Sequence, residues 1–300
     1  MRVFWFLLFA LVNLACLGLF VVSPWLGWWL PKNIASFGQD VDNLFYLILA
    51  ATGFFFVVTQ SVLALAILRY GERPGEKSRY THGHTGLEIT WTLIPLAILI
   101  YLGFAQVPTW AKMKYINVES WFPIRYSGKN LQQDQSICLV ARQWEWRLRY
   151  PQGHIPADQN QWAENGDPGD LHAVNELHVW KNSQVRLHLK TEDVIHSLFL
   201  PNLRLKQDAL PGKTMPVVFQ AIEANVKWDP VAGHLVPLGP GLEWEMACAE
   251  LCGGQHYRMR GRLFVHESKQ DYEKWFAQAL KNQRLRELPK QVAAREGGNR

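Results

Sequence analysis

The stretch Cys248-Ala-Glu-Leu-Cys252-Gly-Gly-Gln-His256-Tyr-Arg-Met259 places four soft metal donors within twelve residues. Two thiols, one imidazole and one thioether follow each other at intervals of four, four and three positions. Thiolate and thioether ligands suit copper, whereas magnesium and calcium prefer oxygen ligands. The donor types therefore predict a soft-metal site in a single loop.

Several kinds of site are compatible with this donor set. Cys248 and Cys252 could form a disulfide, and the Cys-x3-Cys-x3-His spacing could supply part of a tetrahedral zinc site. Zinc gains little from Met259, because it prefers thiolate, imidazole and carboxylate ligands. A mononuclear blue copper site needs only one thiolate, so it leaves the second unused. Two thiolates that bridge two copper ions use every donor, provided that a second histidine comes from an upstream strand.

Two segments upstream of this loop bear on the missing histidine. They are Asp193-Val-Ile-His196-Ser and Leu203-Arg-Leu-Lys-Gln-Asp-Ala-Leu-Pro-Gly212. Together with the Cys-x-Glu-x-Cys-x-x-x-His-x-x-Met pattern, they resemble the binuclear copper (CuA) domain of cytochrome c oxidase subunit II. The resemblance implies two copper ions bridged by the thiolates of Cys248 and Cys252. It also implies imidazole ligands from His196 and His256, a weak thioether ligand from Met259, and the backbone carbonyl of Glu250. It also leaves room for a Mg²⁺ ion near Glu250, at the interface with subunit I.

Composition separates two parts of the chain. The 300 residues have a mean hydropathy of −0.11, but the first third is mostly apolar and the remainder is mixed. The net charge of +5 and the pI of about 9.0 would suit a nucleic-acid partner. However, the lysines and arginines are scattered among acidic residues rather than gathered on one helix or tail. The sequence therefore predicts a membrane part followed by a water-soluble part, without nucleic-acid binding.

The N-terminal part contains three apolar segments of the about 20 residues that a bilayer requires. Residues 1–30 contain either a first transmembrane helix or a cleaved signal peptide. Cys16 also allows a lipoprotein, although Asn13 stands where its processing motif has an aliphatic residue. Residues 41–108 are predicted to form a transmembrane hairpin, with spans at 41–68 and 87–107.

The loop between the two later spans sets the expected topology. It carries the basic residues Arg69, Arg73, Lys77 and Arg79, which favour the cytoplasmic side. Both spans then emerge on the opposite side. We therefore expect the copper domain on the periplasmic face of a bacterial-type inner or plasma membrane.

Glu88 opens the last span, within Glu88-Ile-Thr-Trp91-Thr-Leu-Ile-Pro95, a segment that also resembles the family. Thr85-Gly-Leu-Glu88 has the spacing of a capping box, in which Thr85 caps the helix and Glu88 reaches back. The resemblance implies that a glutamate at this position helps to admit protons from the inner side into subunit I. The sequence leaves both roles open for Glu88.

Residues 109–285 are predicted to form a membrane-anchored all-β domain, which we interpret as a cupredoxin-like Greek-key sandwich or barrel. Short strands with intervening turn residues are expected at 137–150, 176–180, 185–189, 198–206, 215–223, 242–247 and 261–266. The strands on either side of Lys181-Asn-Ser-Gln184 suggest a hairpin.

The segments between and after these strands carry no visible chemistry. Residues 151–173 are rich in Gly, Asp, Asn and Pro, which predicts an exposed loop. Apolar residues at helical spacing predict an amphipathic helix over 268–285 that closes the domain. Residues 286–300 are expected to form a flexible tail.

The segment Gln143-Trp144-Glu145-Trp146 lies near the end of the first expected strand. Period-two alternation places Trp144 and Trp146 on one face, where a tryptophan most often packs in the core. The resemblance implies instead that electrons enter the domain at Trp144. Glu145 replaces the aromatic residue usual between the two tryptophans, which leaves the detail of that contact open.

Electron transfer is the activity that the sequence favours. No nucleophile elbow, phosphate loop or pair of catalytic carboxylates is visible. The resemblance implies that the chain is a subunit of cytochrome c oxidase, a proton-translocating oxidoreductase. In that role it passes electrons from cytochrome c or a similar carrier to haem in subunit I, where oxygen is reduced. Subunit III is a further expected partner. Because no Cys-x-x-Cys-His occurs, we expect no covalent haem.

The competing interpretation is a non-catalytic copper-binding membrane module or a related copper electron-transfer protein. A quinol oxidase subunit that has lost its copper is disfavoured, since every proposed ligand is present. The apolar spans and the segment from Trp91 to Pro95 disfavour nitrous oxide reductase, whose copper domain is similar.

Overall fold

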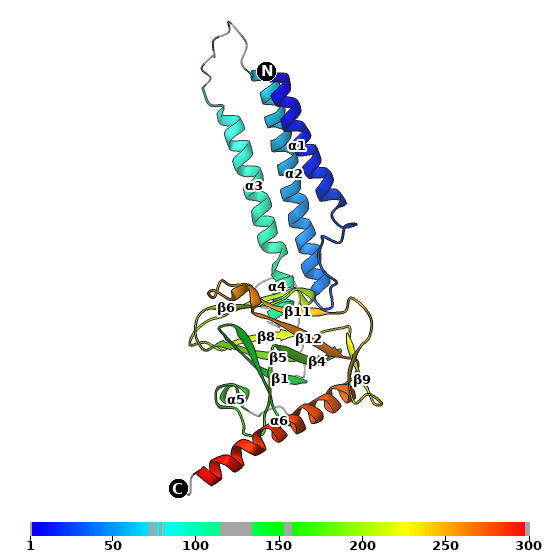
Figure 1. Ribbon diagram of the computed structural model, residues 1–300. Coiled ribbons are helices and arrows are strands. Elements are labelled where there is room, and N and C mark those ends of the chain that lie inside the picture. The colour runs from blue at the N-terminus through cyan, green and yellow to red at the C-terminus, as the bar shows by residue number, and fades with distance from the viewer. Residues whose placement is uncertain are drawn as a thin grey trace. The chain divides into compact units, whose positions relative to one another are not determined.

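The computed structural model describes residues 2–71, 75, 77, 80, 82–114, 134–152 and 158–297, the last eleven as backbone only (Figure 1). The chain divides into two compact units. One comprises Met1–Pro31 and Asp40–Thr109, and the other comprises Lys32–Gln39 and Trp110–Arg300.

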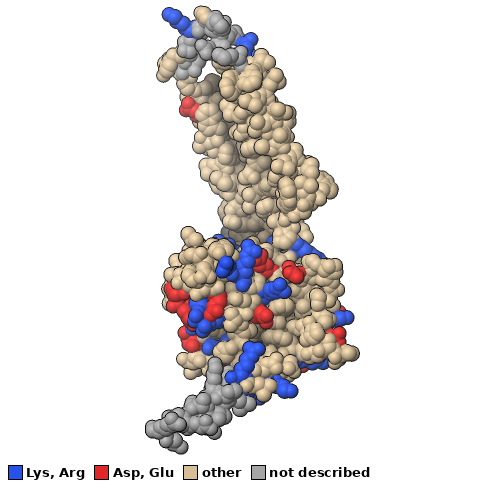
Figure 2. Space-filling view, viewed as in Figure 1, with Lys and Arg blue, Asp and Glu red and all other residues tan. Residues whose placement is uncertain are grey.

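The first unit is built from long apolar helices, as predicted. Within the described residues, three helices are long and apolar enough to cross a membrane, over Arg2–Val22, Gly38–Tyr70 and Thr85–Lys114. They correspond to α1 (Arg2–Val22), α2 (Gly38–Tyr70), and α3 (Thr85–Ala105) followed by α4 (Val107–Lys114). In the view of Figure 2 these spans carry almost no charged side chains, whereas the β domain carries both signs. Their exposed apolar surface suits contact with lipid.

The start of α3 differs from the predicted capping box. His84 is the N-cap residue, and its Nδ1 accepts a hydrogen bond from the backbone N–H of Leu87 at 3.1 Å. Thr85 is consequently the first helical residue rather than the cap. Sequence reasoning missed this because Ser, Thr, Asp and Asn dominate at N-caps. Glu88 still lies in the first turn, where a carboxylate complements the helix dipole.

The second unit is a β sandwich of two sheets, which confirms the predicted cupredoxin-like architecture. One sheet has the order β3-β2-β1-β5-β8 and the other β10-β9-β12-β11-β6-β7, with β4 also paired to β12. The strands are β1 Gln135–Arg142, β2 Glu145–Tyr150, β3 Leu171–Val174, β4 Glu176–Trp180, β5 Val185–Thr191, β6 His196–Leu200, β7 Leu205–Ala209, β8 Met215–Phe219, β9 Val226–Asp229, β10 His234–Pro237, β11 Trp244–Cys248 and β12 Arg260–His266.

Buried apolar side chains of both sheets supply the core of this sandwich. Leu187 and Leu189 of β5 are fully buried, as are Leu177 and Val179 of β4. Fully burying a branched aliphatic side chain stabilises a fold by about 1.5–3 kcal/mol. The two sheets therefore hold together chiefly through buried apolar side chains, and His178 and His188, which lie between the named residues, are buried as well.

The predicted hairpin at 176–189 is wrong. β4 pairs in parallel with β12, whereas β5 pairs with β1 and β8 in the other sheet. The turn between them thus carries the chain from one sheet to the other, with Asn182 at a φ of 64°. Both strands are apolar on the inner face, so local alternation could not distinguish a hairpin from this crossing.

Two other expected strands are each divided by a turn. Residues 137–150 form the antiparallel pair β1–β2, with the turn at Gln143 and Trp144. Residues 198–206 divide at the 3-10 turn Pro201–Leu203 into β6 and β7, which pair antiparallel. Trp144 therefore lies at the tip of a hairpin rather than on a strand face.

The loop expected at 151–173 contains ordered and buried structure. Helix α5 (Gln159–Asn165) buries Trp162, whose indole N–H donates to Asp170 at 2.8 Å. The Arg149 guanidinium lies 5.1 Å from the Trp162 ring centroid. A helix of this length was hidden by the turn-forming residues around it.

The C-terminal amphipathic helix is confirmed but is longer than expected. Helix α6 (Lys269–Gly297) continues past Leu285 and lies against β3, β4, β9 and β12 (Figure 1). Tyr272 and Trp275 face the sandwich, with ring centroids 5.4 Å apart. Their packing gives the apolar stripe of α6 its structural role.

Candidate metal centre

Two adjacent strands and the loop after one of them hold the predicted donors. His196 is the first residue of β6 and Cys248 the last of β11, and these strands are antiparallel neighbours. The loop that follows β11 returns to β12 through the 3-10 turn His256–Arg258. Its two ends are joined by a hydrogen bond from Cys248 N–H to the Met259 carbonyl at 3.0 Å.

The donor atoms converge. The Cys248 and Cys252 sulfurs are 3.8 Å apart, and each faces the Nδ1 of a histidine, at 3.8 Å for His196 and 3.4 Å for His256. The Met259 sulfur lies 3.8 Å from the Cys252 sulfur. Ligand atoms of His196, Cys248 and Cys252 all lie within 4.8 Å of one another. The five side chains that we predicted as ligands thus meet in one place.

Glu250 contributes its main chain. Its carbonyl oxygen lies 3.2 Å from the Cys248 sulfur, whereas the residue as a whole is exposed. The carbonyl that the sequence analysis predicted as a ligand thus faces the thiols, while the Glu250 carboxylate is free to meet solvent or a partner.

An aspartate orients the His196 ring. The Asp193 carboxylate lies 2.8 Å from His196 Nε2, on the side of the ring away from the thiols. With Asp193 ionised, Nε2 carries the ring proton and donates it, so Nδ1 keeps its lone pair toward Cys248. Asp193 also accepts a hydrogen bond from Gln143 N–H at 2.7 Å. The sequence analysis quoted Asp193 only as part of a motif and did not identify this role.

The β1–β2 turn supports the metal loop from the other side. The Gln143 side-chain amide and the Trp144 indole N–H both donate to the Cys252 carbonyl, at 2.7 and 3.2 Å. Gly253 has a φ of 114°, and a Cβ atom there would lie 3.0 Å from the Gln143 amide nitrogen. The glycine after Cys252 thus permits both the turn and the close approach of Trp144.

Electrostatics favour a protonated Cys252 thiol when no cation is bound. Burial, followed by the neighbouring Cys248, raises the pKa of Cys252 to about 12. Burial would also raise the pKa of Asp193, but the hydrogen bonds from Gln143 and His196 keep it below its ordinary value. A metal ion must therefore displace the proton of the Cys252 thiol, so its affinity should rise with pH.

The residues fit copper better than the alternatives. A sulfur–sulfur distance of 3.8 Å is far longer than the about 2.05 Å of a disulfide, and both thiols are free. Two thiols, two imidazole nitrogens and a thioether are soft to intermediate donors. The buried Met259 sulfur beside Cys252 would be superfluous in a zinc site.

The arginines after the metal loop pair with neighbouring acids. Arg260 contacts Glu245 of β11 at 3.0 Å, and Arg262 contacts Glu243, the residue before β11, at 4.0 Å. These contacts balance the positive charge that follows the metal loop. They are exposed, so they contribute little to stability.

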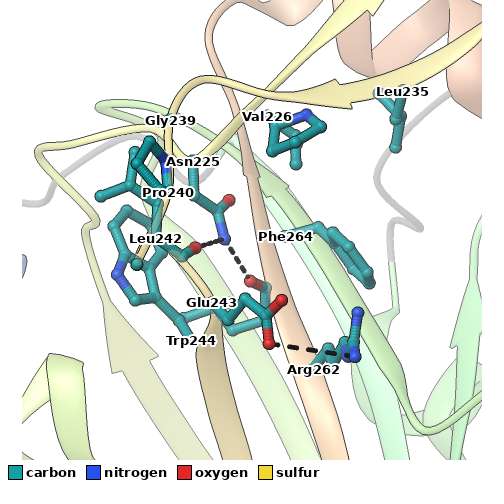
Figure 3. Close-up of a pocket in the computed structure, with 13 residues that line it drawn as sticks. Asn225, Val226, Leu235, Gly239, Pro240, Leu242, Glu243, Trp244, Arg262 and Phe264 are labelled. Carbon is teal, nitrogen blue, oxygen red and sulfur yellow. Dashed lines mark hydrogen bonds and ion pairs between the residues drawn. The ribbon is translucent and has the colours of Figure 1, made fainter.

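A separate hollow lies among β9, β10, β11 and β12 (Figure 3). It has a volume of about 410 Å³, and none of the proposed metal ligands lines it. Asn225 donates to the carbonyls of Leu242 and Leu263, at 3.0 and 2.9 Å. These bonds tie the loop before β11 to β12, which gives this region a structural role.

Comparison with known proteins identifies related chains. The transmembrane domain of cytochrome c oxidase subunit II matches residues 24–108, and its periplasmic domain matches residues 136–262. Together the two matches cover more than two thirds of the chain and leave α1 outside.

Individual relatives agree with these matches. Cytochrome c oxidase subunit 2 of Thermostichus vulcanus is 28% identical over 283 residues, which cover 85% of this chain and 80% of the relative. The probable subunit 2 of Rickettsia conorii is 31% identical over 212 residues, covering 69% and 57%. A crystal structure of the periplasmic domain of subunit II from Bradyrhizobium japonicum is 23% identical, covers 50% of this chain and 96% of that one, and has a TM-score of 0.37.

Proposed function

This chain belongs to the cytochrome c oxidase subunit II family, and from that membership we propose that electrons enter an aerobic respiratory terminal oxidase through it. The observation that carries the proposal is the convergence of two thiols, two imidazole nitrogens and a thioether within one loop and an adjacent strand. A pair of copper ions, when bound there, supplies one-electron redox chemistry.

Each ligand has a role that follows from its position. Cys248 and Cys252 face each other and would bridge the two ions, while the Nδ1 of His196 faces Cys248 and that of His256 faces Cys252. The remaining two donors are the Met259 thioether, a weak ligand, and the Glu250 carbonyl. Carboxylates stay outside this set, which keeps the site soft.

Supporting contacts make the ligand set rigid. Asp193 fixes the His196 ring, and Gln143 fixes the Cys252 main chain. A rigid ligand set changes little in geometry between oxidation states, so little reorganisation opposes electron transfer. The sandwich thus serves as a scaffold for the loop.

Trp144 is the proposed place where electrons enter. The residue is half-buried, and its indole N–H contacts the carbonyl of the ligand residue Cys252. Leu251 and Tyr257 of the same loop are 80% and 65% exposed. Exposed apolar side chains beside a redox site suit docking to a protein partner, which we propose to be cytochrome c or a similar carrier.

As a family member, the chain is a membrane-bound part of an oxidoreductase and associates with other oxidase subunits. We infer that electrons pass on to haem in subunit I, where oxygen is reduced with proton translocation, and that subunit III also contacts the complex. The copper domain lies on the periplasmic side in this proposal. The proposal also includes a Mg²⁺ ion, which the exposed Glu250 carboxylate would bind at the interface with subunit I.

Glu88 is the proposed residue of proton uptake. It lies in the first turn of α3 without serving as the N-cap, since His84 takes that role. An ionisable side chain at the end of a membrane span often has a functional role. Replacement by glutamine should then slow oxidase turnover and leave the copper spectrum unchanged.

Purification of the intact complex tests the function. We expect two copper ions per subunit II, a mixed-valence electron paramagnetic resonance signal, and reduction of the copper before the haem by cytochrome c. One copper ion per chain, zinc retained under excess copper, or a chain that purifies without haem subunits would favour the alternative, a copper-binding membrane module outside an oxidase.

A further inference from the structure

A basic pocket lies beside two edge strands of the β domain and includes none of the copper ligands. It has a volume of about 430 Å³ and is bordered by β7, β8 and the end of α4. Three cationic side chains line it, Lys114, Arg186 and Lys206, and none of its described lining residues is acidic. We propose that this pocket binds the phosphate headgroup of an anionic phospholipid.

The cations of the pocket lack acidic partners among the described residues. Arg186 Nε is shielded from solvent and makes no hydrogen bond there. Lys114 Nζ contacts a neutral group, the side-chain oxygen of Gln207, at 2.8 Å. Asp208, which is near in sequence, accepts a hydrogen bond from the Ser197 hydroxyl at 2.7 Å and does not line the pocket.

An anion would resolve this imbalance. Cations that share a pocket without an acidic partner repel one another, and a guanidinium group binds phosphate oxygens through several N–H groups. The Arg186 guanidinium, together with the ammonium groups of Lys114 and Lys206, would supply positive charge from three different elements. A phosphate diester carries one negative charge and enough acceptor oxygens for all three.

The pocket also has apolar walls, which distinguish a lipid from a free ion. Phe37, Met113 and Val217 line it together with the cations. Inorganic phosphate would leave these walls uncovered. The glycerol and the first acyl carbons of a phospholipid would cover them, and each buried CH₂ group stabilises binding by about 0.8 kcal/mol.

The path of the chain brings this pocket within reach of a bilayer. Met113 and Lys114 end α4, which starts two residues after the apolar helix α3 ends. A helix of eight residues is only about 12 Å long. Lys112 and Lys114 add positive charge in its last turn. Juxtamembrane basic residues attract anionic lipids, so the tether favours a lipid over a soluble anion.

The proposal can be tested on the full-length chain in mild detergent by native mass spectrometry. The probes are short-chain phosphatidylglycerol, short-chain phosphatidylcholine and inorganic phosphate. We expect saturable binding of phosphatidylglycerol, stronger than that of the other two. Arg186→Gln and Lys206→Gln should each weaken it about fivefold, and the double variant about 25-fold, from the loss of one and two cations.

Lys227→Gln on β9 provides the matched control, because it removes an exposed lysine outside the pocket. It should leave lipid binding unchanged. Thermal unfolding of Lys206→Gln, an exposed position, should match the unmodified chain and so separate lost binding from misfolding. Equal binding by the pocket variants, equal binding of inorganic phosphate, or no saturable binding would each overturn the lipid assignment.

Discussion

Among the described residues of the β domain, two clusters each contain two histidines, yet only one of them also brings thiols and a thioether together. In the metal loop, His196 and His256 direct Nδ1 toward cysteine sulfurs. Beneath α6, His178 Nδ1 and His266 Nε2 lie 3.1 Å apart and bond to each other. The first pair presents ring nitrogens to neighbouring thiols, whereas the second pair uses one ring nitrogen of each histidine in a bond to the other.

The surroundings of the second pair, here called the α6 cluster, explain its different character. It comprises His178, His266, Trp275 and Phe264. The His178 ring stacks on Trp275 and Phe264, with centroid distances of 3.7 and 4.5 Å. Both histidines are almost completely buried. Burial and the neighbouring His178 lower the pKa of His266 to about 2, so the pair stays neutral. Histidine content alone therefore does not identify a site; the soft donors beside it do.

The largest effect should come from removing a thiol of the metal loop. Cys252→Ser should eliminate the binuclear centre, because the Cys252 sulfur faces both His256 and Met259. We expect electron transfer from the donor to fall at least about 100-fold, the upper end of what removal of outer contacts produces. Copper analysis and electron paramagnetic resonance of the purified complex measure the result.

Cys138→Ser is the matched control for that variant. Cys138 is also buried and free, but it contacts the Ala163 carbonyl on another part of the sandwich. It should keep both copper ions. Two ions retained in Cys252→Ser would refute the bridging role.

Loss of the carboxylate behind His196 should have the next largest effect. Asp193→Asn removes the charge that orients the ring and keeps Nδ1 free, so copper affinity should fall about 10- to 100-fold. Competition with a copper chelator measures this. Asp208→Asn, which changes an acid bonded to Ser197 instead, should have no comparable effect. Equal affinities for the two variants would remove Asp193 from the site.

The α6 cluster should respond to pH rather than to copper. A histidine with a lowered pKa in the folded state stabilises the fold above its unfolded pKa of about 6.5, and this contribution is lost as pH falls. For His266, with a folded pKa of about 2, the loss between pH 7 and pH 5 is about 2 kcal/mol. Unfolding of the copper-free chain as a function of pH should show this slope.

A substitution separates that slope from the other titrating groups. His266→Phe should flatten the pH dependence while lowering stability at pH 7, since His178 loses its partner. His234→Phe, on an exposed strand residue, should preserve the slope. An unchanged slope in His266→Phe would show that the α6 cluster does not control stability at low pH.

The same contrast shows why the sequence revealed the site more completely than the fold. Cys248 through Met259 lie within one loop, so their spacing alone brings the donors together. The assignment of β4 and β5 to different sheets depends on β12 and β1, which lie far along the chain. Short-range alternation carries no information about such partners, and it therefore suggested a hairpin.

The side chains that orient the histidine rings could not be predicted from the sequence either. Asp193 lies three residues before His196, but its bond to Gln143 N–H spans fifty positions. The mutual bond of His178 and His266 spans 88 positions. A resemblance supplied His196 as a ligand, whereas the reason for its orientation required the folded chain.

The smallest effect should come from Trp144, which touches the metal loop without supplying a ligand. Trp144→Phe keeps an aromatic ring at the tip of the β1–β2 turn but removes the hydrogen bond to the Cys252 carbonyl. Gln143 still holds that carbonyl at 2.7 Å, so the loop and its copper should persist. We expect donor-to-copper electron transfer to slow about tenfold, the lower end for contacts outside the ligand set.

Trp180→Phe, at a half-buried tryptophan that packs on Tyr272, is the control and should not alter the rate. Stopped-flow reduction at several salt concentrations measures both variants, because attraction between oppositely charged surfaces weakens with ionic strength. A normal rate in Trp144→Phe would place electron input elsewhere, and a rate that rises with salt would argue against an oppositely charged donor.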